Sequence, residues 1–387
     1  MNNTVAHFIR KSSQLKASFI SSQIRSYINY RPVVIYRYES KKDDGGFSDF
    51  NANGLRVLGL SRKRGPDINF RYLRKISRGD VRKVLCYLDD NQVTVLHFHY
   101  GNDAAIYSDV MRLSGRPSVV SFYGYDASSF RTRLMGVGGY LLRKRLFPYV
   151  SKVLAMSPDM ANDLLRMGCP EEKITIHYYG SEVNRFFLLR DHLNGKPTIE
   201  FLIISGLEPQ KGHRFLLEAF KKAHDVNVDI RLKIVGSGSI EREIRNFINR
   251  NNMGSYVSLS GKVTFASERH LDALSKADVF IHPSVTAKNG DKEGIPGAIV
   301  EAMAAGLPII STRHAGIPYI IKNRETGILV NEWDVLGLTS AILELASDAN
   351  LRAKLGTCSQ SFAVQHLNVR EKESELEDIY ASLPSGG

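Results

Sequence analysis

Two glutamates eight residues apart, Glu293 and Glu301, frame the segment of this chain whose residue types are best suited to chemistry. Pro296 and Gly297 lie between them and favour the start of a helix, because proline fixes φ and needs no N–H donor in a first turn. Such a helix start exposes unpaired N–H groups and a partial positive charge, which favour an anion such as a diphosphate. Both carboxylates could then accept hydrogen bonds from hydroxyl groups beside that anion. This pattern predicts a site for a sugar nucleotide.

The residues on either side of this segment predict the elements that would hold it. Gly306 and Pro308 favour the end of a helix of about ten residues. The apolar runs 277–282 and 307–311 are typical of buried parallel strands. This order places the loop before the helix at a carboxyl end of a sheet, where open α/β sheets bind ligands. An ordinary amphipathic helix with a surface glutamate at each end is the alternative.

The run 284–318 resembles the retaining glycosyltransferases of family four, and among them the exopolysaccharide enzymes of the colanic-acid type. Its centre reads E-G-I-P-G-A-I-V-E-A-M-A-A-G-L-P-I-I-S, and the resemblance continues through E-T-G-I-L-V at 325–330 and, more weakly, through most of the chain. The resemblance implies that Glu293 contacts hydroxyls of a donor sugar and that Glu301 holds the ribose of its nucleotide. The backbone groups expected around the sugar and diphosphate are those of Gly294, Ile295 and Gly297.

A second motif lies at 205–212, where S-G-L-E-P-Q-K-G follows an apolar strand. It resembles the family's G-R-L-x-x-x-K-G turn, which implies that Lys211 holds the donor diphosphate. A lysine at such a turn is a suitable point charge for phosphate. Gly206 stands in the place of the family's arginine. Either His213 or Arg214 replaces the missing charge, or the donor binds less tightly.

Two strand ends in the first half also carry polar residues. His97 and His99 close one apolar strand, and Tyr123 and Asp126 follow the next. In this place His99 is structural about as often as it is catalytic, and His97 is structural more often than that. The resembling family has H-x-H and H-G-x-D here, which implies contact with the acceptor and the donor sugar, and Tyr123 stands where histidine is common. Because a tyrosine with a pKa of about 10 is a poor base, we expect Tyr123 to orient or contact the leaving group and Asp126 to contact a sugar.

Length and composition set the class of protein. A chain of 387 residues is too long for one core, and its 43% hydrophobic content is typical of folded proteins. Three distant cysteines, Cys86, Cys169 and Cys358, give neither a disulfide framework nor a zinc-binding pattern. No apolar run reaches the roughly 18 residues of a membrane span, and no signal peptide is evident. We expect a cytoplasmic protein that meets a membrane only at its inner face.

Positive charge is concentrated in the first half of the chain. Residues 1–200 hold 31 Lys and Arg against 18 Asp and Glu, whereas 201–387 hold 21 against 22, so the first half supplies the whole net charge of +12. Basic clusters lie at 62–83 and within 130–147, where apolar residues alternate with them as in a membrane-surface segment. Anionic lipid or a polyprenyl-diphosphate-linked acceptor would explain the charge, and a solvated basic surface is the alternative. Nucleic acid is not expected, because no zinc-finger, RNA-binding or helix-turn-helix signature is present.

Strand-like and helix-like segments alternate along the whole chain. This alternation predicts an α/β fold with two Rossmann-like domains facing across a cleft, the GT-B architecture of the resembling family. We expect an N-terminal acceptor-side domain at 1–187, a linker at 188–198 and a nucleotide-sugar-binding domain at 199–365. The family also implies that a final helix within 366–387 packs back on the first domain.

These observations predict a retaining glycosyltransferase that moves a hexose from a UDP- or GDP-sugar to a hydroxyl of a lipid-linked glycan in surface polysaccharide biosynthesis. No cofactor or metal is expected, because Lys211 and a helix N-terminus would neutralise the diphosphate and no Asp-x-Asp motif occurs. A sugar-nucleotide epimerase or hydrolase of the same architecture is one alternative. A non-catalytic membrane-surface partner with a degenerate site is the other.

Overall fold

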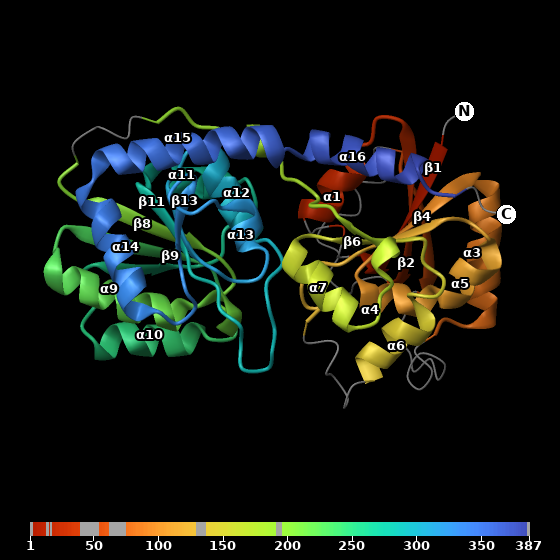
Figure 1. The fold of residues 1–387 in the computed structure, drawn as a ribbon, viewed down its shortest axis with the longest axis horizontal. Helices are drawn as coiled ribbons and strands as arrows, with labels where there is room; N and C mark the ends of the chain where they lie inside the picture. Colours follow the sequence, from red (N-terminus) through yellow and green to blue (C-terminus); the bar gives the residue numbers. More distant parts are fainter. Residues whose placement is uncertain are drawn as a thin grey trace. The chain divides into compact units, whose positions relative to one another are not determined.

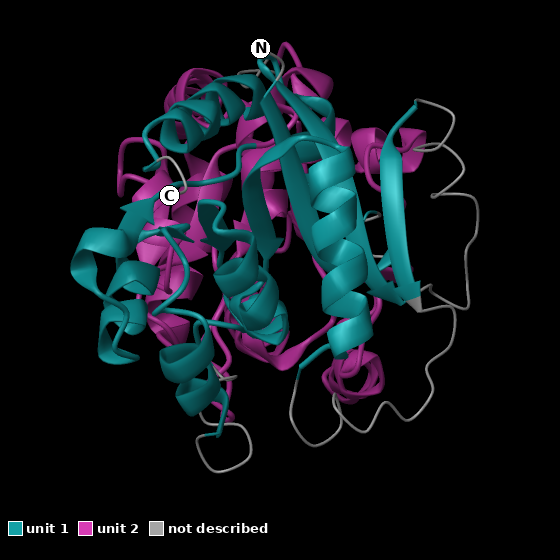
Figure 2. Cartoon of the chain, turned by 90° about the vertical axis from the view of Figure 1, so that its right-hand side faces the viewer, with its two compact units in different colours: residues 1–180, 369–387 teal, residues 181–368 magenta. Residues whose placement is uncertain are grey.

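The structure is a computed structural model that describes residues 3–12, 15, 18–38, 54–61, 75–128, 137–190 and 196–384. The chain divides into two compact units, Met1–Gly180 with Val369–Gly387 and Ser181–Asn368. Each unit is a parallel sheet with helices around it (Figures 1 and 2). The α/β fold with two Rossmann-like domains is therefore confirmed.

The first unit is built on a parallel sheet whose order in the described residues is β3-β2-β1-β4-β5-β6-β7. The order reverses between β1 and β4, and the carboxyl ends of strands at such a switch point form the usual ligand site of this architecture. β1 and β4 are buried along almost their whole length, as expected of central parallel strands. The strands are β1 (Asn3–Lys11), β2 (Tyr30–Tyr38), β3 (Arg56–Ser61), β4 (Val93–His99), β5 (Ser118–Ser121), β6 (Lys152–Ala155) and β7 (Ile174–Ile176).

Two helices of the first unit begin after a serine whose side chain caps them. Ser77 precedes α3 and accepts a hydrogen bond from Asp80 N, and Ser157 precedes α7, in which Pro158 occupies the first position. α4 starts at Gly101, where a Cβ atom would lie 2.1 Å from the Phe122 ring. In the described residues before the second unit, the α-helices are α1 (Ser18–Arg25), α3 (Arg78–Asp90), α4 (Gly101–Ala104), α5 (Ser108–Ser114), α6 (Val137–Arg145) and α7 (Pro158–Arg166).

The last helix, α16 (Val369–Ala381), belongs to the first unit although it follows the second in sequence. Its Glu377 carboxylate accepts hydrogen bonds from Ile28 N at 2.7 Å, Asn29 N at 2.9 Å and Asn29 Nδ2 at 2.7 Å. Its Tyr380 hydroxyl lies 2.9 Å from the Tyr27 hydroxyl. These contacts tie α16 to the segment between α1 and β2.

The second unit is a parallel sheet of order β10-β9-β8-β11-β12-β13, with its switch point between β8 and β11. Its strands are β8 (Ile199–Ile204), β9 (Ile230–Val235), β10 (Val257–Ser260), β11 (Val279–His282), β12 (Ile309–Thr312) and β13 (Gly327–Val330). Its main helices are α8 (Val183–Phe186), α9 (His213–Val226), α10 (Glu241–Arg250), α11 (Glu268–Lys276), α12 (Gly297–Ala304), α13 (Ile317–Ile320), α14 (Val335–Ser347) and α15 (Ala349–His366). The helix expected after Pro296 is thus present with eight residues rather than ten.

The two units divide at Gly180, earlier than the expected linker at 188–198. α8 belongs to the second unit because the Phe186 ring packs against the rings of Phe265 and His270, with centroids 5.4 Å and 5.3 Å away. Arg190 donates a hydrogen bond to Ala277 O at 2.8 Å, which fixes the start of the expected linker to the same unit. Residues 191–195 lie outside the described ranges.

The basic segment 130–147 is only partly described, because its residues 130–136 lie outside the described ranges. In α6 and just after it, Leu142, Leu146 and Phe147 are buried, so these apolar side chains belong to the core. The exposed residues there include Tyr140, Arg143 and Lys144. In the part of the chain that the structure describes, no helix has the length and apolar character needed to cross a bilayer.

Candidate functional site

Loops after β8 and β11 meet closely at the carboxyl edge of the second sheet. Gly212 has a φ of 69°, and a Cβ atom there would lie 1.9 Å from Pro283 O. Val285 N donates a hydrogen bond to Gln210 O at 2.9 Å, which joins the same two loops. Only glycine permits this approach, since any side chain would collide with the opposing backbone.

The junction of these loops brings together two residues expected from the sequence. Lys211 Nζ lies 2.6 Å from Glu293 Oε2, and the two side chains are only 18% and 12% exposed. Lys211 comes from the turn after β8, whereas Glu293 comes from the loop between β11 and α12. The ion pair therefore marks one place at which an ammonium and a carboxylate are both available to a ligand.

A buried histidine fixes the backbone at Glu293, and sequence reasoning did not identify it. Glu293 N donates a hydrogen bond to His314 Nε2 at 3.1 Å, so Nε2 carries no proton. The proton of the neutral ring is then on Nδ1, which lies 2.7 Å from Glu332 Oε1. Glu332 also accepts a hydrogen bond from Thr286 N at 2.7 Å. His314 lies within the run that resembles the family, but its pairing with Glu332 depends on the fold.

The N-terminus of α12 has no side-chain cap. Pro296 is the N-cap residue, in extended conformation, and no side-chain oxygen accepts a hydrogen bond from the first turn. Gly294 and Ile295, which precede it, are buried, whereas Gly297 is partly exposed. The first-turn N–H groups are therefore suited to an anion.

Glu301 lies on α12 and is 8% exposed. Its Oε1 atom is 3.8 Å from the position that a Cβ atom of Gly297 would take, so the carboxylate lies back towards the first turn. His270 Nε2 is 3.3 Å from Glu301 Oε2, without the alignment of a hydrogen bond. The Glu301 carboxylate therefore lies close to the uncapped first turn of α12.

The place of the family's arginine remains without a positive charge. A Cβ atom at Gly206 would meet only Glu208 Cγ, at 3.8 Å, so a side chain would have room there. Arg214 Nε donates a hydrogen bond to Glu218 at 2.7 Å, and its guanidinium lies 4.4 Å from the centroid of the Phe247 ring. His213 is buried against Ser205, and burial, with a smaller effect of Lys211, lowers its pKa to about 4. In this structure the Arg214 charge is thus paired with Glu218, and His213 is neutral at pH 7.

Asp126 in the first unit is fully buried, and backbone groups occupy its carboxylate. Oδ2 accepts a hydrogen bond from Gly101 N at 2.8 Å, and Oδ1 accepts from Tyr123 N at 3.0 Å and Gly124 N at 3.1 Å. Asp126 thereby joins the ends of β4 and β5. This arrangement favours a role in positioning these turns rather than the sugar contact expected from the sequence.

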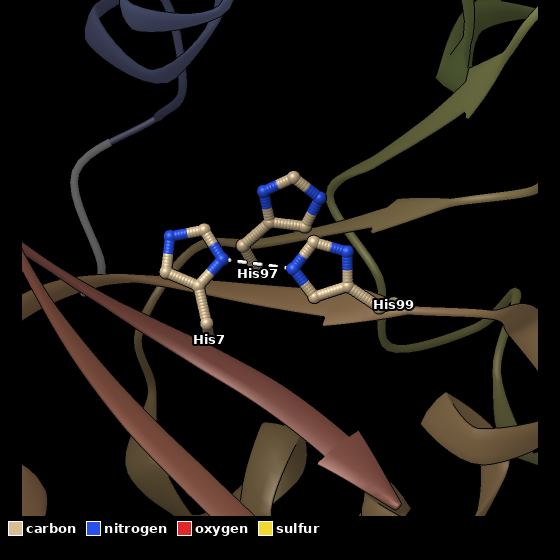
Figure 3. A group of neighbouring side chains, drawn as sticks. All are labelled: His7, His97 and His99. Atoms are coloured by element: carbon tan, nitrogen blue, oxygen red, sulfur yellow. Dashed lines mark hydrogen bonds between the residues drawn. The ribbon is translucent and has the colours of Figure 1, made fainter. Parts of the chain in front are cut away.

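Three buried histidines lie side by side on β1 and β4 (Figure 3). His99 Nδ1 lies 2.7 Å from the Tyr123 hydroxyl, and His99 Nε2 lies 2.9 Å from His7 Nδ1. The ring nitrogens of His97 lie 2.5 Å from the Tyr380 hydroxyl and 2.8 Å from Ser121 Oγ. Burial lowers the pKa of His99 to about 3 and holds the pKa values of the other two well below 6.5, so all three rings are neutral at pH 7.

The three histidines of this cluster lie close enough together for a metal site. One nitrogen from each of His7, His97 and His99 lies within 4.8 Å of the others. However, the ring of His99 is inclined by only 13° to that of His97 and 20° to that of His7. Imidazole lone pairs lie in the ring plane, so nearly parallel rings do not direct three lone pairs at one ion. We therefore assign the cluster to hydrogen bonding.

Comparisons with known proteins identify the family of this chain. Residues 31–180 match the family model described as "Glycosyl transferase 4-like domain", and residues 198–348 match "Glycosyl transferases group 1". The putative colanic acid biosynthesis glycosyltransferase WcaL of Salmonella typhimurium is 33% identical over 294 residues, which cover 75% of this chain and 70% of WcaL. The chain belongs to the group 1 glycosyltransferase family. The family expected from the sequence is therefore confirmed.

Other relatives of this glycosyltransferase are consistent with the assignment. The amylovoran biosynthesis glycosyltransferase AmsK of Erwinia amylovora is 32% identical over 256 residues, which cover 66% of this chain and 61% of AmsK. A crystal structure of Anabaena HepE in complex with UDP and glucose has a TM-score of 0.77 at 16% identity, covering 98% of this chain and 99% of HepE. The relatives are transferases, so an epimerase or a non-catalytic partner is not favoured.

The buried Asp126 predicts a pH dependence of stability. Burial raises its pKa to about 6, although backbone N–H groups partly oppose this, whereas an unfolded aspartate has a pKa of about 3.9. The folded chain therefore holds the proton more tightly, and this stabilisation is lost as the pH rises from about 4 to about 6. We expect the unfolding free energy of the native chain relative to Asp126→Asn to fall by about 2–3 kcal/mol over that range, in urea titrations. If the difference in unfolding free energy between the native chain and Asp126→Asn stayed constant over this pH range, the prediction would be wrong. Asp90→Asn, at an exposed position, is the matched control.

Proposed function

We propose that this glycosyltransferase moves a hexose from a UDP- or GDP-sugar to a hydroxyl of a lipid-linked glycan, with retention, in surface polysaccharide biosynthesis. The observation that carries the proposal is the Lys211–Glu293 pair in the same unit as the uncapped start of α12. The names of WcaL and AmsK support the pathway class, and HepE with UDP and glucose supports the donor class.

The ion pair suggests how the donor is received. In the absence of donor, Lys211 and Glu293 neutralise one another. A nucleoside diphosphate sugar supplies a partner for each, because the diphosphate takes the ammonium and the sugar hydroxyls take the carboxylate. This exchange leaves neither charge unpaired in a partly buried place, which would otherwise be costly.

The same groups support the chemical step. The acceptor hydroxyl attacks the anomeric carbon on the face from which the diphosphate departs, so the new glycosidic bond forms as the bond to the diphosphate oxygen breaks. The acceptor's proton passes to the departing phosphate oxygen. Lys211 and the first-turn N–H groups of α12 stabilise the charge that develops on the diphosphate. Because they supply this positive charge, we propose a reaction that needs no divalent metal.

Residues of the first unit are assigned to the acceptor side. Burial raises the pKa of Tyr123 well above 10, so its hydroxyl stays protonated and does not act as a base. Tyr123 is partly exposed, and His99 directly behind it is buried. We propose that Tyr123 binds a sugar oxygen and that His99 and Asp126 hold the turn that carries it.

We further propose that the enzyme works at the anionic inner face of the cell membrane, where lipid-linked glycan is present. The excess of Lys and Arg over Asp and Glu in residues 1–200 supports this proposal. The exposed Arg143 and Lys144 on α6 also support it.

Co-sedimentation tests the membrane proposal. The enzyme should pellet with anionic vesicles at low salt, much less with neutral vesicles, and less again when salt is added. Reversing two charges, with Arg143→Glu and Lys144→Glu together, should weaken recovery. Equal recovery with both kinds of vesicle would rule the proposal out.

Replacing the loop carboxylate tests the transfer reaction. Glu293→Gln keeps the shape of the side chain but weakens its hydrogen bonds to sugar hydroxyls, so we expect turnover to fall by roughly 100-fold or more. UDP affinity, measured by calorimetry, should not fall, because the diphosphate no longer has to displace a carboxylate from Lys211. Glu325→Gln alters an exposed glutamate that pairs only loosely with Lys322 and is the control that should retain turnover. Retained turnover in Glu293→Gln would remove the role assigned to this residue.

A gain-of-affinity variant tests the diphosphate assignment. Gly206→Arg places a guanidinium where the chain has room for it, and a charge-assisted hydrogen bond to phosphate should tighten UDP binding by roughly tenfold. Gly254→Arg adds the same charge at an open position on another loop and should leave the affinity unchanged. If both variants bind UDP like the native enzyme, the diphosphate does not lie beside residue 206.

A further inference from the structure

We propose that His7 is a positioning residue that acts through His99 to turn the hydroxyl of Tyr123 outward, as a hydrogen-bond donor to a sugar oxygen. The identity of that oxygen as part of a sugar rests on the function proposed above. His7 itself touches no substrate in this scheme. It lies on β1, behind His99, and is fully buried.

The three side chains form a continuous series of hydrogen bonds. His7 Nδ1 lies 2.9 Å from His99 Nε2, and His99 Nδ1 lies 2.7 Å from the Tyr123 hydroxyl. Figure 3 shows the rings of His7 and His99 turned so that these two nitrogens point toward one another. Each neutral histidine carries one ring proton, so the whole series can run in one direction or in the other.

The unused nitrogen of His7 decides between the two directions. His7 Nε2 is buried and has no hydrogen-bond partner among the described residues. If Tyr123 donated inward, the series would end with a proton on this atom, and a buried N–H group would be orphaned. If His7 Nδ1 donates outward instead, only a lone pair is left unused. Orphaned buried N–H groups are the rarer and more costly case, so the outward direction is favoured.

In the outward direction, the Tyr123 oxygen accepts the proton of His99 Nδ1. With its oxygen accepting from inside the protein, the remaining O–H bond of Tyr123 is free to donate to a ligand. The residue as a whole is partly exposed, as contact with a ligand requires.

Packing holds the ring of Tyr123, so rotation of its O–H bond is the main conformational freedom that remains. Its ring centroid lies 4.7 Å from those of Phe19 and Tyr100 and 5.9 Å from that of Tyr179. The ring is also nearly parallel to that of His99, at 12°. Because the ring is held from several sides, a hydrogen bond at the oxygen sets which way the proton points.

The two histidines of the series carry no charge near neutral pH. Burial holds the pKa values of His7 and His99 far below 7. Glu373 of α16 influences Tyr123 electrostatically, but burial raises its pKa well above 4.5, which favours its neutral form. Tyr380, which lies beside His97, also has a raised pKa and stays a neutral phenol.

The test compares two replacements of His7. His7→Asn keeps an N–H donor close to the place of Nδ1, whereas His7→Leu removes it. We expect kcat/KM to fall by about five- to tenfold in His7→Leu and to recover to within about threefold in His7→Asn. In a Tyr123→Phe background, His7→Leu should have no further effect, because the hydroxyl that it positions is gone. A full additional loss in that background would mean that His7 only supports the fold, and the proposal would be overturned.

A spectroscopic measurement tests the direction of the same series of hydrogen bonds without substrate. Long-range ¹H–¹⁵N spectra of histidine-labelled enzyme should show His99 with its proton on Nδ1, and the opposite tautomer would overturn the proposal. UDP affinity of His7→Leu should equal that of the native enzyme, since UDP is assigned to the other unit. If the native enzyme binds UDP-sugar but transfers nothing, the proposed function fails, and the tautomer still decides the role of His7.

Discussion

The close approach of two backbone segments at the carboxyl edge of the second sheet is the constraint on which the candidate donor site depends. Gly212 permits it, because any Cβ atom there would overlap Pro283 O. The approach fixes the turn that carries Lys211 and sets it against the loop that carries Glu293. Because folding has already placed the two backbone segments, the Lys211 and Glu293 side chains need to lose only their rotamer freedom to meet.

The two units use the same architecture for different electrostatic purposes. In both, the candidate residues lie after strands next to the switch point, where the carboxyl ends of parallel strands converge. The second unit places an ammonium and an uncapped helix start there, which suits a diphosphate. The first unit places neutral histidines and tyrosines there, which suit the uncharged hydroxyl groups of a sugar.

Much of the fold could be predicted from the sequence, because buried parallel strands are continuous apolar runs. The run 277–282 became β11 and the run 307–311 became β12, each within two residues. β3 is harder to recognise, because its sequence, R-V-L-G-L-S, contains a glycine that normally indicates a turn. A Cβ atom at Gly59 would lie 2.7 Å from the Tyr36 hydroxyl on β2, so any other residue there requires the Tyr36 side chain to shift. That requirement comes from a neighbouring strand and leaves no local signal.

The sequence by itself determined the motifs that lie within one segment, such as Glu293 and Glu301 around a helix start and Lys211 in a strand-to-helix turn. Spacing within one element fixes where such residues stand relative to one another. Only the tertiary structure decided that His314 holds the backbone of Glu293 and that His7 reaches His99, 92 residues away. Hydrogen bonds between elements depend on which strands and loops become neighbours and on which ring atoms face each other, and local residue patterns do not encode either.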